Sequence, residues 1–219
     1  MATYRNAREF LVEVTARYRA IASYSDVGVV RPTWKSDPLS CWFETQYEGP
    51  SSFRFQFIRP HPYRKLRHLL TKYIAGCDGN TAYFVTEQRG QSPKVESQES
   101  LEMAVAGATG ISQGTAHTIG SLLLECVGGA SLSVLQRPRF RSARSFDGVA
   151  CYRVSGVFPH IGRFTLWVGM QDLLLRKVVN HRHRKEEVRF RIEVNKPMNP
   201  DVFCVPKTDP ALNLAPIAR

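Results

Sequence analysis

Ser52-Phe53-Arg54-Phe55-Gln56-Phe57 alternates large apolar residues with polar ones, which is the period of a half-buried antiparallel strand. This strand belongs to a series of apolar runs between residues 26 and 87, separated by short turn sequences. One of these turns contains Asp78-Gly79, and Asp-Gly between two apolar runs is a strong hairpin signal because both residues tolerate positive φ angles. The segment predicts an antiparallel meander without βαβ alternation. Such a meander argues against most enzyme folds and indicates a curved sheet that wraps around something.

Helical periodicity precedes and interrupts the meander. Residues 5–23 predict a helix, because apolar residues recur at spacings of three and four, namely Ala7, Leu11, Val14, Tyr18 and Ile21. A helical insert is expected at about 97–127, with helices over 101–106 and 116–126. Strands are expected before it, near 27–33, 39–48, 51–58, 65–76 and 80–88, and after it, near 140–146, 149–157, 162–169, 173–181 and 186–195.

The length and composition are those of one globular domain. A chain of 219 residues can bury roughly 70% of its unfolded surface. We expect one domain at 1–206 and a disordered tail at 207–219, which is rich in Pro and small residues. The sequence contains no apolar run of about 18 residues. Its first residues also lack the apolar stretch of a signal peptide.

The cysteines do not predict a metal or redox motif. There are five, an odd number, and no two form a C-x-x-C pair: Cys41, Cys77, Cys126, Cys151 and Cys204. We expect most of them to pack as small hydrophobic residues. Whether two of the cysteines form a disulfide is left open at this point.

Positive charge is concentrated in the second half of the chain. Of the formal net charge of +11, residues 137–191 hold thirteen Arg or Lys against four acids, a local net charge of +9. Such a surface would attract nucleic acid, anionic lipid headgroups or an acidic protein. Solvated strand faces are the simpler explanation, because in 188–194 the charges alternate with core residues, although alternation does not explain the excess of one sign.

Several short motifs have the order found in a known superfamily. Arg59-Pro60 and Tyr63 lie between two expected strands and are followed by Asp78-Gly79 and the aromatic pair Tyr83-Phe84. Later, the run Phe164–Val168 is followed by Asp172–Arg176, an aromatic strand, a turn and an apolar-basic strand. Over about residues 5–206 this arrangement resembles the outer-membrane lipoprotein carrier (LolA-like) superfamily. Its predicted periplasmic members of unknown function are the most similar, notably around 108–112.

The resemblance implies an α+β, mostly β fold: an unclosed antiparallel β half-barrel with the N-terminal helix and the helical insert covering its concave face. In the carrier the cavity between sheet and helices holds the acyl chains of a lipoprotein. We therefore expect a non-catalytic binding protein for a lipid or acylated ligand, without cofactors, monomeric, and with at most transient contact with the membrane surface. The alternative functions are a regulatory or structural protein-interaction module that uses the basic face 137–191, and a small serine hydrolase at Ser112. An envelope protein is the other partner considered. The resemblance implies a periplasmic location, and the missing signal peptide leaves a cytoplasmic one open.

Two sets of residues are candidates for the site. The cavity lining is expected to include Trp42, Phe43, Phe55, Phe57, Tyr83, Leu122 and Trp167, although core packing would explain each of them as well. Anionic headgroups or a protein partner are expected to contact Arg153, Arg163, Arg176 and Arg189. The segment Phe164–Val168 is apolar on both faces, as a strand would be with helix or ligand on one side and other cover opposite.

Three other chemistries are weighed against simpler explanations. Gly110–Gly114 fits the G-x-S-x-G nucleophile elbow around Ser112, with His117 nearby. An elbow needs a strand before it, and here a loop between two helices is expected instead. His181 and His183 have the spacing of two metal ligands on a strand, but their cationic neighbours favour a solvated hairpin tip. Nucleic acid is not expected either, because the aromatic residues among the arginines lie where the sheet needs core residues.

Overall fold

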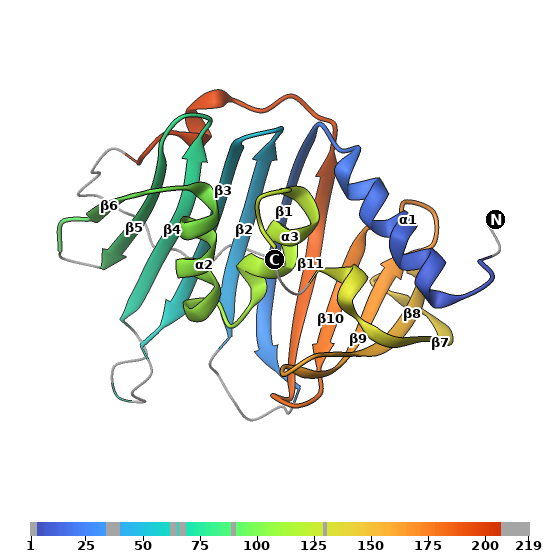
Figure 1. Cartoon of the computed structure of the whole chain (residues 1–219). Coiled ribbons are helices and arrows are strands. Elements are labelled where there is room, and N and C mark those ends of the chain that lie inside the picture. The colour runs from blue at the N-terminus through green and yellow to red at the C-terminus, as the bar shows by residue number, and fades with distance from the viewer. Residues whose placement is uncertain are drawn as a thin grey trace.

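Antiparallel strands form one open, curved sheet in the computed structural model of the chain (Figure 1), which describes residues 4–33, 40–61, 65, 69–88, 91–128 and 131–206. The eleven strands of these residues follow the order β6-β5-β4-β3-β2-β1-β11-β10-β9-β8-β7. They are β1 Ser23–Pro32, β2 Cys41–Glu48, β3 Ser52–Pro60, β4 Leu70–Asp78, β5 Ala82–Gln88, β6 Lys94–Gln98, β7 Gln136–Phe146, β8 Val149–Phe158, β9 Gly162–Gly169, β10 Leu175–Asn180 and β11 Lys185–Val194. The predicted unclosed half-barrel is therefore confirmed.

The halves of the sheet come from different parts of the chain. Strands β1 to β6 precede the helical insert, strands β7 to β11 follow it, and β1 pairs with β11 at the seam between them.

The predicted Asp78-Gly79 turn closes the hairpin between β4 and β5. The Asp78 carboxylate accepts hydrogen bonds from the backbone N–H groups of Thr81 (2.8 Å) and Asn80 (3.0 Å), which lower the pKa of Asp78, and Gly79 has φ +104°.

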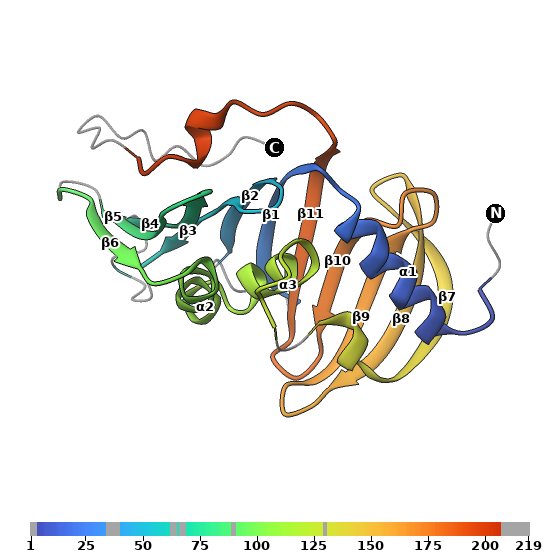
Figure 2. The same cartoon turned by 45° about the horizontal axis from the view of Figure 1, so that its top comes forward.

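Helices cover the concave face of the sheet, as Figure 2 shows from the side. They are α1 Ala7–Arg19, α2 Leu101–Ile111 and α3 Thr115–Leu123, with the short 3₁₀ helix η2 at Leu132–Val134. Helix α1 begins at Asn6, whose side chain accepts hydrogen bonds from the N–H groups of Arg8 and Glu9. Its Phe10 packs against Phe140 of β7 and Tyr152 of β8. Helix α2 contacts β4 and β5, and α3 lies over the centre of the sheet (Figure 1).

The C-terminal segment crosses the opposite, convex face (Figure 2). It contains the 3₁₀ helix η3, Pro200–Phe203, which contacts β3 and β4. The Tyr83 hydroxyl of β5 donates a 2.7 Å hydrogen bond to the Phe203 carbonyl oxygen. This segment therefore covers part of the sheet that the helices leave uncovered.

Several details differ from the sequence prediction. Strand β4 begins at Leu70 rather than at 65, β7 begins at Gln136 rather than at 140, and α2 runs to Ile111 rather than to 106. Helix α1 is shorter than 5–23, β1 already begins at Ser23, and β6 was not predicted. Because β6 runs to Gln98, the helical insert starts after it, at Leu101, rather than at 97. The expected tail at 207–219 and Tyr63 lie outside the described residues.

Candidate functional site

A cavity of about 600 Å³ lies on the concave face, between α3 and strands β9, β10 and β11. Its apolar lining is formed by Val30, Leu132, Phe158, Ile161, Phe164, Leu166 and Val178. Strands β10 and β11 and their turn add the polar residues Asn180, His183, Lys185, Glu186 and Glu187. The helical side is polar and is formed by Thr109, Gln113, Thr115, His117, Thr118 and Ser121. The arrangement can enclose an apolar chain against the strands while hydroxyl and amide groups face it from the helices.

The cavity is open at the end of the sheet where the β8–β9 and β10–β11 turns lie. Ile161 and His183, from these two turns, line the cavity and are exposed to solvent. On the helical side His117 is held in place, because its Nε2 lies 2.7 Å from the Gly128 carbonyl oxygen. The lining of the cavity therefore reaches solvent at these two turns.

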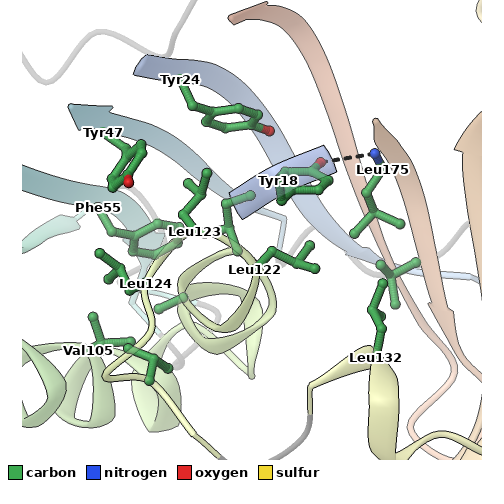
Figure 3. Packing of buried hydrophobic residues seen from close by; sticks show 14 of the residues in the cluster. Tyr18, Tyr24, Tyr47, Phe55, Val105, Leu122, Leu123, Leu124, Leu132 and Leu175 are labelled. Carbon is green, nitrogen blue, oxygen red and sulfur yellow. Dashed lines mark hydrogen bonds between the residues drawn. The ribbon is translucent and has the colours of Figure 1, made fainter. Parts of the chain in front are cut away.

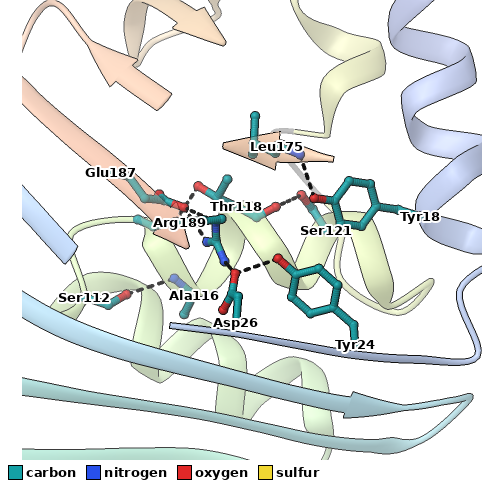
Figure 4. A network of polar contacts seen from close by, with 11 residues as sticks. Tyr18, Tyr24, Asp26, Ser112, Ala116, Thr118, Ser121, Leu175, Glu187 and Arg189 are labelled. Atoms are coloured by element: carbon teal, nitrogen blue, oxygen red, sulfur yellow. Dashed lines mark hydrogen bonds and ion pairs between the residues drawn. The ribbon is translucent and has the colours of Figure 1, made fainter. Parts of the chain in front are cut away.

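An ionic network lies under α3 beside the cavity (Figure 4). Arg189 of β11 forms ion pairs with Asp26 of β1 and with Glu187, which itself lines the cavity. The Tyr24 hydroxyl donates a 2.6 Å hydrogen bond to Asp26, and the Thr118 hydroxyl of α3 donates one to Glu187. The network thus connects both halves of the sheet to the helix that covers the cavity.

Burial dominates the electrostatics of this network. It raises the pKa of Glu187, although the Arg189 guanidinium opposes the shift. It also raises the pKa of Tyr24, and the Asp26 carboxylate adds to the effect. Burial acts to lower the pKa of Arg189, but Asp26 and Glu187 outweigh it and raise that pKa well above its ordinary value. The guanidinium therefore keeps its charge, and Glu187 binds its proton more tightly than an exposed glutamate does.

Four of the expected lining residues are on the concave face but belong to its packed core. Phe43, Phe55, Phe57 and Leu122 are each at most 2% exposed. Phe55 lies against the loop after α3, together with Leu123 and Leu124 (Figure 3). None of the four lines the cavity. The helices therefore seal the part of the concave face at which the sequence placed the ligand, and the cavity lies farther along it.

The other three expected lining residues are on the convex face, which corrects that prediction. Trp42 lies in a groove with Val188 and Phe190, and the Trp167 ring stacks with Arg153. Tyr83 is covered by the C-terminal segment. Side chains alternate between the faces of a strand, so Trp42 points away from the cavity because its neighbour Phe43 points inward.

The four candidate arginines occupy different environments. Arg153 and Arg163 lie on the convex face, where Arg163 is exposed. Arg176 is partly buried and forms an ion pair with Asp172. Arg189 cannot contact a headgroup or a partner, because its side chain is fully buried between Asp26 and Glu187. That part of the prediction is wrong, since helix α3 covers the face toward which Arg189 points.

The nucleophile-elbow motif around Ser112 and the histidine pair His181 and His183 have simple structural roles. Ser112 ends α2 and accepts a 3.1 Å hydrogen bond from the Ala116 N–H, so the motif is a link between helices, as expected, and not an elbow. His117 is bonded to Gly128 and not to Ser112. His181 and His183 lie in the β10–β11 turn, and His181 bonds the Thr165 hydroxyl at 2.9 Å.

Metal and disulfide sites are absent from the described part of the chain. No three His, Cys, Asp or Glu residues gather there in a way that could hold a metal ion. All five cysteines are free, with Cys41, Cys77 and Cys151 buried and Cys126 and Cys204 exposed. Within the same residues, no helix has both the length and the apolar character needed to cross a bilayer.

Sequence reasoning missed most of the cavity residues. The exception is the segment Phe164–Val168, which was singled out as apolar on both faces and supplies Phe164 and Leu166 to the lining. Val178 is the partner of Leu166 on β10, so its place could have been inferred once that pairing was known. The polar residues of α3 gave no such signal, because Thr and Ser on a short helix are equally typical of a solvated surface.

Solved structures with the same fold are distant in sequence. The lipoprotein LppX of Mycobacterium tuberculosis superposes with a TM-score of 0.54 and 12% identity, over 89% of this chain and 98% of that chain. LprF of Mycobacterium bovis gives 0.51 and 13%, over 88% and 94%. An uncharacterized conserved protein of Thermus thermophilus gives 0.50 and 7%, over 90% and 94%.

At such identities the similarity concerns the fold. A scan against protein-family models finds no match, and no curated protein matches the sequence. The structures nevertheless agree with the motifs around Arg59-Pro60, Asp78-Gly79 and Phe164–Val168, which pointed to the same architecture. With its open antiparallel sheet and the helices on its concave face, the chain has the half-barrel fold that the LolA-like resemblance implied, and it shares this fold with LppX and LprF.

Proposed function

We propose that this protein binds a lipid or an acylated ligand in the cavity between α3 and strands β9 to β11. The observation that carries the proposal is the cavity of about 600 Å³ with seven apolar residues in its lining. Its size is within the range of roughly 300–1,000 Å³ that is typical of small-ligand sites. Transfer of an acyl chain from water to such a surface contributes about 0.8 kcal/mol for each methylene group.

The fold supports this ligand class over others. The resemblance to the lipoprotein carrier implies an acyl chain held between sheet and helices, and the cavity has this position, although it is lined by other residues than expected. We propose a role as a carrier-like or sensor-like protein of the cell envelope, monomeric and without catalysis. The hydrolase alternative loses its support, because Ser112 has neither the elbow geometry nor a histidine partner among the described residues.

Two neighbouring valines allow a matched test. Val178 lines the cavity, whereas Val179, the next residue of β10, pairs with Thr165 and points to the convex face. A Trp at either position adds the same volume. Val178→Trp is expected to fill the cavity and weaken the binding of cis-parinaric acid, a fluorescent fatty acid, by on the order of tenfold, while Val179→Trp should leave the affinity unchanged.

Native mass spectrometry of the protein purified from cells identifies the ligand class. The expected result is a stoichiometric co-purifying acyl species, found again by lipid analysis after organic extraction and lost in Val178→Trp. A clean apo mass together with no uptake of cis-parinaric acid or phospholipid would reject the proposal. Equal binding by both tryptophan variants would place the ligand outside the cavity.

A further inference from the structure

The convex face carries a transverse row of cationic and aromatic side chains that the proposed ligand site does not use. In the strand ladders Arg141 of β7 is directly opposite Arg153 of β8, and Arg153 is opposite Trp167 of β9. Trp167 is in turn opposite Lys177 of β10. Side chains at paired positions point to the same face of a sheet. The four residues, which we call the convex row, therefore lie side by side, facing away from the helices.

The guanidinium groups of the convex row are held in fixed positions. The guanidinium carbon of Arg153 lies 4.6 Å from the centre of the Trp167 ring, a cation–π geometry. The Arg153 side chain also donates a 3.3 Å hydrogen bond to the Ser142 carbonyl oxygen. Arg141 donates from Nε to the Ser155 hydroxyl at 2.7 Å. These groups lose little side-chain freedom when a partner binds, which favours recognition.

Much of the charge in this region is not neutralised. Lys177 forms an ion pair with Glu186, whereas Arg141, Arg144 and Arg153 form none with any described residue. Like charges directly opposite each other destabilise a sheet. Burial and then the charges of Arg144 and Arg141 lower the pKa of Arg153. An anionic partner would relieve this repulsion.

A groove with apolar residues on part of its lining continues the row toward the middle of the sheet. The register leads from Lys177 to Val188 of β11, then to Val29 of β1 and Trp42 of β2. Val188, Val29 and Trp42, together with Phe190, form the apolar part of a groove of about 510 Å³, and Arg31, Ser40, Asp147 and Arg191 form the rest of its lining. The rings of Trp42 and Phe190 meet edge to face at 6.4 Å. Such a groove accepts an inserted side chain, which the flat surface of a membrane does not provide.

We propose that the convex row and this groove bind an extended acidic segment of a partner protein. One apolar or aromatic side chain of the segment occupies the groove beside Trp42 and Phe190, and its carboxylates pair with Arg141 and Arg153. Three strand spacings separate Val188 from Arg153, which is about 14 Å. An extended chain covers this distance in about four residues. Arg and Trp are also the residues that most often dominate the binding energy of protein interfaces.

The test uses a synthetic peptide and the whole protein. A fluorescein-labelled peptide with a run of glutamates, a Gly-Ser spacer of about four residues and one Phe is titrated by fluorescence anisotropy. The expected result is saturable binding that weakens with salt and is lost when either the glutamates or the Phe is removed. Stronger binding to phosphatidylglycerol vesicles or to a single-stranded oligonucleotide than to the peptide would overturn the proposal.

Matched variants locate the binding site on the protein. The double variant R141E/R153E is expected to weaken peptide binding by on the order of tenfold or more, and Trp42→Ala by a similar factor. The double variant R5E/R184E changes the net charge equally at two exposed sites away from the row and should bind like the unchanged protein. Circular dichroism confirms that each variant is folded. Equal weakening by both charge reversals would show an unspecific charge effect and reject the site.

Discussion

Arg189 of β11 and Asp26 of β1 form an ion pair in which both side chains are completely shielded from solvent. The pair lies at the seam where the half of the sheet that precedes the helical insert meets the half that follows it. Glu187 binds the same guanidinium group, with Nε to Oε1 at 2.8 Å. Residues that are far apart in sequence therefore form a buried ion-pair network across the seam between the two halves of the sheet.

Removal of one partner of this pair should be costly. We expect Asp26→Ala to lower the free energy of unfolding by about 3–5 kcal/mol, because it leaves part of a buried charge uncompensated. Urea unfolding followed by circular dichroism measures the loss. The control is Lys196→Ala, which breaks the exposed pair with Glu193 and should cost less than about 1 kcal/mol. A similar small loss for both variants would contradict the structural role of the Asp26 pair.

The two adjacent glutamates of β11 should respond to pH in opposite directions. Burial raises the pKa of Glu187, so its contribution to stability is fully present below its ordinary pKa of about 4.5 and is lost as the pH rises through the higher value in the folded protein. Burial also acts to raise the pKa of Glu186, but hydrogen bonds from Lys177 and Arg31 outweigh it and lower that pKa. The contribution of Glu186 is therefore present above its ordinary pKa and is lost as the pH falls.

Urea unfolding of the protein and of Glu187→Gln and Glu186→Gln, from about pH 3 to pH 8, tests both signs. The stability of the unchanged protein relative to Glu187→Gln should fall as the pH rises above about 4.5. Relative to Glu186→Gln it should fall as the pH drops below that value. The same sign for both variants would contradict the difference in their environments.

The hydroxyl of Tyr18 should stabilise the contact of α1 with the sheet. It accepts a 3.0 Å hydrogen bond from the Leu175 backbone N–H of β10 (Figure 3), and burial raises the pKa of Tyr18 to about 12. Tyr18→Phe leaves that buried N–H without an acceptor, and we expect a loss of about 1–3 kcal/mol with faster hydrogen exchange of the Leu175 amide. The control is Tyr47→Phe, because the buried Tyr47 hydroxyl makes no hydrogen bond within the described residues. Equal losses would show that the ring environment, and not the hydrogen bond, determines the effect.

The sequence predicted the strands well because alternation and turn residues are local signals. Ser52–Phe57 and the Asp78-Gly79 turn specify hairpins without any knowledge of the rest of the chain. Strand β6 was missed because its sequence, Lys94-Val95-Glu96-Ser97-Gln98, is polar and mostly exposed. It is ordered by pairing with β5 at the edge of the sheet, a tertiary effect that no pattern in five residues reveals.

The site was harder to predict, because the alternation of apolar and polar residues assigns side chains to the two faces of the sheet but does not indicate which face is concave. Trp42 and Phe43 are adjacent on β2, so at most one of them could face the cavity. Arg189 has the alternation of a solvated strand face, yet α3 covers it and Asp26 pairs with it. The position of a helix over a sheet depends on the connections and the packing of the whole chain. The sequence could therefore predict the architecture but not the lining of the cavity.

Two glycines separate the effect of close backbone packing from that of helix propensity. A Cβ on Gly28 of β1 would collide with the Phe43 ring and with the Val188 carbonyl oxygen, and the latter belongs to the seam with β11. We expect Gly28→Ala to lower the free energy of unfolding by about 1–3 kcal/mol. A Cβ on Gly110, in the last turn of α2, would meet nothing within 4 Å, so Gly110→Ala should raise stability by about 0.5–1 kcal/mol. Thermal and urea unfolding measure both, and a neutral Gly28→Ala would show that the seam can open enough to accept a methyl group.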